Sequence, residues 1–217
     1  MKSVFRHVLS ALLLAVLSGC CTTPRNLSFV KDDLTRYHDE CYGPQFSAAA
    51  NRARNYLTWR AAHLRPGEKA GVVFDIDETA LSNWPGMQVS DYSMAIFLFE
   101  HWANRAICPV LPPTLAIYKE ARRAGMSVFF ISGRPEVLRA ATERNLRRAG
   151  YTDYARLYLR PMKYDQPSII PFKSAQRKAI EAKGYHIVLN IGDQWSDLKG
   201  GYAERTFKLP NPFYFIP

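Results

Sequence analysis

Two aspartates stand two residues apart directly after an apolar run, in residues 74–79 (FDIDET). Carboxylates that end a buried strand are costly without a counter-charge, because an unpaired charge in a low-dielectric site shifts its pKa and takes up a proton. A divalent cation is the natural counter-charge for two such groups. Mg²⁺ prefers hard oxygen ligands, keeps several waters and leaves room for a phosphate oxygen. Asp75 and Asp77 therefore indicate a magnesium site.

Further polar residues follow later apolar runs. Ser132 and Gly133 lie in ISGRP, where a hydroxyl and the backbone amides that open the next helix can receive an anion. Lys173 opens another helix and places an ammonium within reach of a phosphate. Asp193 and Asp197, in GDQWSD, supply a second carboxylate pair. Two carboxylate pairs, a hydroxyl and a lysine together describe a metal-assisted phosphoryl-transfer site.

The elements that must position these side chains alternate between strands and helices. Nearly continuous apolar sequence predicts buried parallel strands at 70–76, 126–131 and 186–191, with a weaker one at 155–159. Helices that each end at a glycine are predicted at 113–124, 135–149 and 172–183. This alternation predicts an α/β fold with an open parallel, Rossmann-like sheet. Right-handed crossovers then bring the carboxyl ends of the strands to one edge, where ligands bind.

Two segments lie outside this alternation. The apolar spacing over 46–64 predicts an amphipathic N-terminal helix, preceded by a tether and N-terminal segment over 20–45. Residues 81–112 are aromatic and interrupted by prolines, so we expect a small insertion over the ligand-binding edge within a domain that spans 46–217. We expect most of the aromatic side chains of the insertion to form a small core of their own. One or two of them would instead form a stacking surface for a flat leaving group.

The N-terminus has the pattern of a targeting segment. Two basic residues precede the apolar stretch 8–17, and LSGC follows it, which resembles the bacterial lipobox. We therefore expect residues 1–19 to be a lipoprotein signal peptide and Cys20 to carry the lipid, which makes the protein an exported lipoprotein of the cell envelope, facing the periplasm or in the outer membrane. The alternative is an ordinary cleaved signal with a coincidental cysteine. Export also permits a disulfide between Cys41 and Cys108, which the sequence leaves open.

Composition limits the partners. The 217 residues include 29 Lys and Arg against 19 Asp and Glu, for a formal charge of +10, which favours anionic partners. The arginines within 139–148 share one helix with little aromatic interleaving, so they favour a solvated face, and we expect no nucleic-acid partner. A hydrophobic content of 47% excludes a disordered chain. The sequence does not indicate an oligomeric state.

The motifs around Asp75, Ser132, Lys173 and Asp193, in this order, resemble the haloacid dehalogenase (HAD) superfamily of phosphatases. Within it the chain resembles the class IIIB branch, which holds plant acid phosphatases, vegetative storage proteins and bacterial class C lipoprotein acid phosphatases. The closing stretch from residue 207 is similar to the C-terminus of the plant members. Gly86 departs from the bacterial pattern, which has an aromatic residue there.

The resemblance implies the HAD fold and a Mg²⁺-dependent acid phosphatase that hydrolyses small phosphomonoesters, nucleotides among them. Asp75 would attack phosphorus and form an aspartyl-phosphate. Asp77 would protonate the leaving alcohol, later take a proton from water, and contact the metal through its backbone carbonyl. Because Asp77 must start protonated while Asp75 is ionised, we expect activity to fall above neutral pH.

The same resemblance assigns the remaining residues. Ser132, Gly133 and Lys173 would hold the phosphate oxygens. Asp193 would bind Mg²⁺ together with Asp75, and Asp197 would be a ligand through water or an anchor behind the ligands. The intermediate would equally permit transfer to another alcohol. The alternative of a different class is a catalytically weak protein of the same fold that binds or stores phosphate esters.

Overall fold

The computed structural model of the chain describes residues 24–93 and 95–217. The expected signal peptide at 1–19 and the lipidation of Cys20 lie outside these residues and stay predictions. The chain divides into two compact units, one that ends at Thr35 and one that comprises Arg36–Pro217. Among the described helices, none has the length and apolar character needed to cross a membrane.

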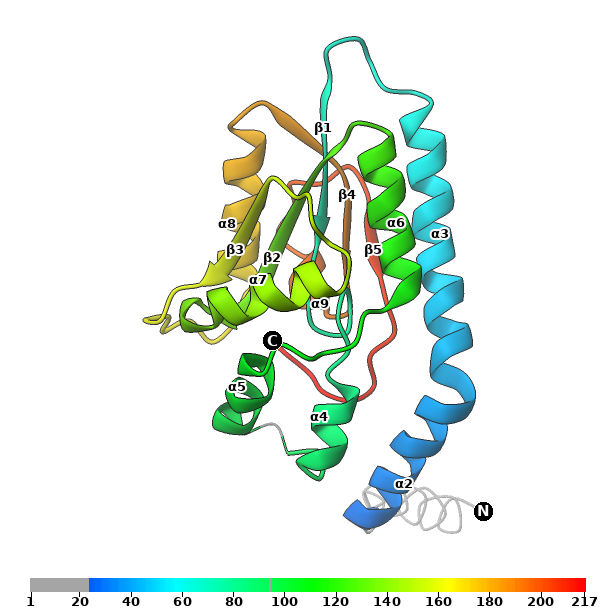
Figure 1. Cartoon of the computed structure of the whole chain (residues 1–217), viewed down its shortest axis with the longest axis vertical. Coiled ribbons are helices and arrows are strands. Elements are labelled where there is room, and N and C mark those ends of the chain that lie inside the picture. Colours follow the sequence, from blue (N-terminus) through cyan, green and yellow to red (C-terminus); the bar gives the residue numbers. More distant parts are fainter. Residues whose placement is uncertain (1–23, 94) are drawn as a thin grey trace, which may run out of the picture. The chain divides into compact units, whose positions relative to one another are not determined.

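A five-stranded parallel sheet forms the centre of the second unit, in the order β3-β2-β1-β4-β5 (Figure 1). Its strands are β1 (Lys69–Phe74), β2 (Ser127–Pro135), β3 (Arg156–Arg160), β4 (Tyr185–Gly192) and β5 (Thr206–Lys208). The expected α/β fold with an open parallel sheet is confirmed. The short strand β5 at the edge was not predicted, because three residues carry no periodic signal.

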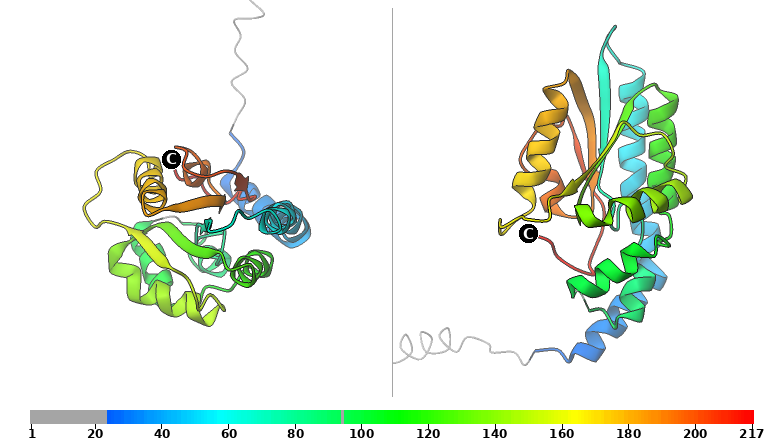
Figure 2. Two further views of the ribbon diagram at one scale, coloured as in Figure 1. Left: turned by 90° about the horizontal axis from the view of Figure 1, so that it is seen from above. Right: turned by 60° about the vertical axis from the view of Figure 1, so that its left-hand side comes forward.

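Helices cover both faces of this sheet (Figure 2). They are α3 (Gly43–Ala61), α6 (Pro112–Arg123), a 3₁₀ turn (Glu136–Leu138) that leads into α7 (Arg139–Arg148), α8 (Ile170–Glu181) and the short α9 (Trp195–Leu198). Because side chains alternate along a strand, neighbouring residues of β1 enter different cores. Val72 and Phe74 pack with residues of α3 and α6, whereas Val73 packs with Phe172 and Ile180 of α8.

Helical structure begins before the predicted helix at 46–64. It comprises α2 (Leu27–Tyr37), a π-helical turn (His38–Tyr42) and then α3. Much of the segment 20–45, which was expected to hold a tether and an N-terminal segment, is therefore helical. The π turn ends two residues before Pro44, whose missing N–H interrupts ordinary helical bonding and makes a continuous helix hard to foresee from sequence.

The insertion at 81–112 contains two helices, α4 (Trp84–Val89) and α5 (Ile96–Asn104). Both lie beyond the carboxyl edge of the sheet, the edge at which the parallel strands end (Figure 1). These two helices were not predicted from the sequence. The two cysteines whose pairing the sequence left open, Cys41 and Cys108, are both free.

Candidate active site

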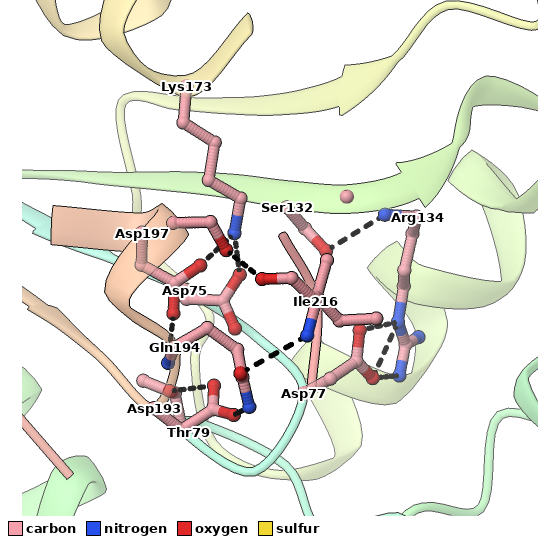
Figure 3. Close-up of polar contacts among 12 residues, drawn as sticks. Asp75, Asp77, Thr79, Ser132, Arg134, Lys173, Asp193, Gln194, Asp197 and Ile216 are labelled. Atoms are coloured by element: carbon pink, nitrogen blue, oxygen red, sulfur yellow. Dashed lines mark hydrogen bonds and ion pairs between the residues drawn. The ribbon is translucent and has the colours of Figure 1, made fainter. Parts of the chain in front are cut away.

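Three carboxylates meet at the carboxyl edge of the sheet (Figure 3). Asp75 follows β1, Asp193 follows β4 and Asp197 belongs to α9. Each offers an oxygen within 4.8 Å of the others, and all three side chains are buried. The ammonium of Lys173, in the first turn of α8, lies 2.5 Å from Asp75 Oδ1 and also donates to Asp197. The fold therefore brings together four of the residues that the sequence analysis selected.

This cluster holds more negative than positive charge away from water. Burial and the negative charge of Asp197 raise the pKa of Asp75 well above its usual value, although the ammonium of Lys173 offsets part of this shift. Burial and the charge of Asp197 raise the pKa of Asp193 to about 6. Burial disfavours the charged ammonium of Lys173, but the two carboxylates outweigh it and raise its pKa. One ammonium beside three carboxylates leaves a charge excess that a divalent cation matches, and the oxygen donors suit such an ion.

The Asp77 side chain points away from this cluster. Arg134 Nη2 lies 2.6 Å from Asp77 Oδ1, and Asn83 Nδ2 lies 2.7 Å from the same oxygen. Burial alone would raise the pKa of Asp77, but the buried Arg134 guanidinium outweighs it, so the pKa is lowered. The expected metal contact of this residue is its backbone carbonyl, so the ion pair of its carboxylate does not compete with that role.

Ser132 and Gly133, which were expected to bind phosphate together with Lys173, differ in whether they line the cavity. Ser132 is completely buried, and its Oγ accepts a hydrogen bond of 3.2 Å from the Arg134 N–H. Gly133 lines the same cavity as Asp75 and Lys173. The main chain at Gly133, more than the Ser132 hydroxyl, therefore faces the space in which a phosphoryl group would bind.

This cavity has a volume of about 190 Å³ and a largely apolar outer wall. The wall includes Met87, Ile96, Phe99, Trp102 and Ile216. Gly86 is the position at which the chain departs from the bacterial pattern. A Cβ there would lie 2.6 Å from the Trp102 ring, so the glycine makes room for the indole. Trp84 instead stacks on His38 with ring centroids 3.8 Å apart, outside the cavity lining.

Several residues that the sequence analysis did not assign contact the site. Asn83 bridges Asp77 and Glu78, while Asn211 and Tyr214, from the segment after β5, reach Asp193 and Glu78. Asn83 lies close to the aspartate motif in sequence, which was a usable signal. The two C-terminal residues belong to the closing stretch that resembles the plant members, but that resemblance did not indicate which residues their side chains contact.

We expect Gly192→Ala to destabilise the site. Gly192 ends β4, and a Cβ there would lie 2.4 Å from both the Cβ and Oδ2 of Asp197. Overpacking of this kind lowers the free energy of unfolding by about 1–3 kcal/mol, which urea denaturation would measure. Gly43→Ala is the control, because among the described residues no atom outside its own helix backbone and chain neighbours lies within 4 Å of the new methyl group, and alanine favours a helix. Equal stability of the two variants would contradict the prediction.

A family model described as HAD superfamily, subfamily IIIB (acid phosphatase), matches residues 22–217. The stem 28 kDa glycoprotein of Glycine max is 38% identical over 181 residues, which are 81% of this chain and 71% of that protein. Acid phosphatase 1 of Solanum lycopersicum is 40% identical over 148 residues, 66% of this chain and 58% of that protein. Vegetative storage protein 1 of Arabidopsis thaliana is 36% identical over 149 residues, 67% of this chain and 55% of that protein.

Among solved structures, the class C acid phosphatase from Bacillus anthracis with tungstate bound is similar in fold. The TM-score is 0.72 at 22% identity, over 87% of this chain and 86% of that one. A second structure of the Bacillus anthracis enzyme has a TM-score of 0.68 at 21% identity, over 85% of this chain and 86% of that one. These likenesses support the arrangement of strands and helices described above.

Proposed function

Since the chain belongs to subfamily IIIB of the HAD superfamily, the acid phosphatases, which are phosphoric monoester hydrolases, we propose that it hydrolyses small phosphomonoesters with Mg²⁺ through an aspartyl-phosphate on Asp75. The observation that carries this proposal is the buried cluster of Asp75, Asp193, Asp197 and Lys173 beside a cavity at the carboxyl edge. Nucleotides are among the proposed substrates.

Asp75, Asp193 and Asp197 would hold the metal ion, together with the backbone carbonyl of Asp77. All three carboxylates are buried and their oxygens already face one another, so binding needs little rearrangement. When bound, the ion neutralises charge on the phosphoryl oxygens, and such electrostatic stabilisation is often the largest single contribution to catalysis.

In the first step, a carboxylate oxygen of Asp75 forms a bond to phosphorus while the bond from phosphorus to the ester oxygen breaks. Asp77 gives its proton to the leaving oxygen, which departs as an alcohol. Lys173, which lies against Asp75, would hold a phosphoryl oxygen together with the main chain of Gly133, and the position of both residues in the cavity lining supports this. In the second step Asp77 takes a proton from water, whose oxygen attacks phosphorus and releases phosphate from Asp75.

Arg134 and Asn83 hold the carboxylate of Asp77 before the reaction. Both side chains come from segments that also form the cavity lining, so the acid is fixed relative to the bound ester. Phe99 lies over the Arg134 guanidinium, with the guanidinium carbon 5.8 Å from the ring centroid. Because the ion pair with Arg134 lowers the pKa of Asp77, the proton that Asp77 must donate is lost at a lower pH than from a free carboxyl group. The expected fall of activity should therefore begin already below neutral pH, which a pH profile would test.

The relationship to vegetative storage proteins favours a second candidate, a catalytically weak protein that binds or stores phosphate esters. The presence of Asp75, Asp77 and Lys173 in one site argues for the enzyme instead, because a storage role requires none of them. Transfer of the phosphoryl group to another alcohol is a variant of the same mechanism, in which the alcohol replaces water in the second step.

Removal of metal is the experiment that tests the proposal. A panel of phosphomonoesters (p-nitrophenyl phosphate, glycerol phosphate and nucleoside monophosphates) should release phosphate in Mg²⁺. A chelator should lower the rate at least about 100-fold, because the charge on the phosphoryl oxygens then lacks the cation that stabilises it. Excess Mg²⁺ should restore the rate. Turnover that is insensitive to chelator would contradict the metal site, and no turnover on any ester in Mg²⁺ would favour the storage candidate.

We also propose that the protein is an exported lipoprotein, anchored to a membrane of the cell envelope through lipid on Cys20. The support is the sequence alone: a basic start, an apolar stretch of signal-peptide length and the LSGC motif. Metabolic labelling with a fatty acid, compared between the natural chain and Cys20→Ser, would test it.

A further inference from the structure

The segment after β5, residues 211–217, lies along the candidate active site; we refer to it as the C-terminal segment. In Figure 1 it passes from the edge of the sheet toward α5, beyond the ends of the central strands. Tyr214 and Ile216 line the same cavity as Asp75 and Lys173. The segment is therefore part of the site's wall, although it contributes no residue to the mechanism described above.

The C-terminal segment is held by contacts near both of its ends. The Phe213 ring packs against Trp84 and Tyr42, with ring centroids 5.0 and 5.2 Å apart. Further along, Ser196 Oγ donates to the Ile216 carbonyl at 2.8 Å. The Ile169 N–H donates to the Pro217 carbonyl at 2.9 Å, directly before α8. Because the segment is anchored at Phe213 and again at Ile216 and Pro217, the side chains between these contacts have defined positions.

Asn211 holds the metal-binding carboxylate of Asp193. Its Nδ2 donates to Asp193 Oδ2 at 2.7 Å, and Thr79 Oγ1 donates to Asp193 Oδ1 at 3.1 Å. The Asn211 Oδ1 accepts from the Phe213 N–H at 2.8 Å, so the amide is oriented by the segment's own turn. Because Asp193 is completely buried, its orientation depends on these donors and on Gln194, not on water.

Tyr214 acts on the other side of the site, through a short chain of hydrogen bonds. Its hydroxyl donates to Glu78 Oε2 at 2.7 Å. Asn83 Nδ2 donates to the same Glu78 oxygen at 3.1 Å and to Asp77 Oδ1 at 2.7 Å. Glu78 has a φ of +50°, a conformation that non-glycine residues keep only where the surroundings enforce it. The Tyr214 hydroxyl thus helps to fix the loop that carries the acid.

We propose that Asn211 and Tyr214 are positioning residues for the phosphatase reaction: Asn211 sets the affinity of Asp193 for the metal, and Tyr214 sets the placement of Asp77 toward the leaving group. The roles of Asp193 and Asp77 come from the proposed function, on which this inference rests. It assigns two separate tasks to one segment, so each task has its own measurable consequence.

Asn211→Ser tests the first task. Serine retains an acceptor for the Phe213 N–H but is too short to reach Asp193. With Mn²⁺ as the probe and free ion counted by electron paramagnetic resonance, the dissociation constant should rise about 10- to 100-fold. Asn51→Ser, at an exposed position of α3, is the matched control and should bind as the natural chain does. An unchanged Mn²⁺ constant in folded Asn211→Ser would overturn this task; Asn211→Thr serves if the serine variant does not fold.

Tyr214→Phe tests the second task, because it removes only the hydroxyl. A misplaced acid matters most for a poor leaving group, so kcat on glycerol phosphate should fall about 10-fold or more relative to kcat on p-nitrophenyl phosphate. The Mn²⁺ constant should not change. Tyr202→Phe, at a partly exposed tyrosine outside the site, is the control. An equal loss on both esters would indicate general loosening of the structure and would overturn the assignment to Tyr214.

Asp77→Asn, measured beside Tyr214→Phe, separates this inference from the proposed function. It should show a larger leaving-group dependence in the same direction, because it removes the acid itself. If Asp77→Asn shows the dependence and Tyr214→Phe does not, the inference fails and the proposed mechanism stands. If neither shows it, the assignment of Asp77 as the acid fails. The Mn²⁺ measurement on Asn211→Ser needs no turnover and remains decisive for the first task in either case.

Discussion

Asp75→Asn is expected to lower kcat roughly 10⁴- to 10⁶-fold on every phosphomonoester that the protein hydrolyses, in line with losses seen when a nucleophile is removed. An amide cannot form the aspartyl-phosphate, whereas its shape and volume match the carboxyl group that it replaces. The measurement is phosphate release in saturating Mg²⁺ with each ester of the panel. A loss below about tenfold would exclude Asp75 as the nucleophile.

The same variant should fold as well as the natural chain. Burial and the neighbouring carboxylates raise the pKa of Asp75, so its ionised form is unfavourable in the folded state without a cation. A neutral asparagine removes that cost, and the melting temperature measured in chelator should not fall. This separates loss of chemistry from loss of structure: a large decrease in melting temperature would make the kinetic result uninformative about the nucleophile.

Lys173→Met is expected to have the largest effect on stability. Lys173 is almost wholly buried, and its ammonium pairs with both Asp75 and Asp197. Removal of one partner from a buried charge cluster costs about 3–5 kcal/mol, because the other charges stay buried and uncompensated. For a domain of this size the melting temperature should fall by about 10 °C, measured by circular dichroism in chelator. Turnover should be lost as well, since no ammonium then faces the phosphoryl group.

Two companion variants make the Lys173 result specific. Lys178→Met lies on the exposed side of the same helix and should change the melting temperature little. Lys173→Met combined with Asp197→Asn should recover part of the lost stability, because it removes one of the uncompensated carboxylates. If the double variant is no more stable than Lys173→Met alone, the cost arises from packing and not from charge.

Asp75→Asn and Lys173→Met probe the part of the site that was predictable from sequence. Apolar strands that end in Asp75 or Asp193 carry a local signal, and a parallel sheet must bring such strand ends to one edge. Lys173 was selected because it opens a helix and could there meet a phosphate, and the fold puts that helix beside the same edge. The alternation of strands and helices was therefore sufficient for the fold class and for the carboxylate cluster.

The tertiary structure alone decided how these residues divide their tasks. It turns the Asp77 carboxylate to Arg134 and Asn83, and it buries the Ser132 hydroxyl under the neighbouring backbone. It also places the C-terminal segment against Asp193, a contact that no local pattern encodes. The physical reason is that periodicity reports only which positions become buried, whereas a hydrogen bond or ion pair depends on the exact distance between segments far apart in the chain. The location of the strand ends at one edge follows from the topology, but the hydrogen-bond and ion-pair partners of their side chains follow from packing.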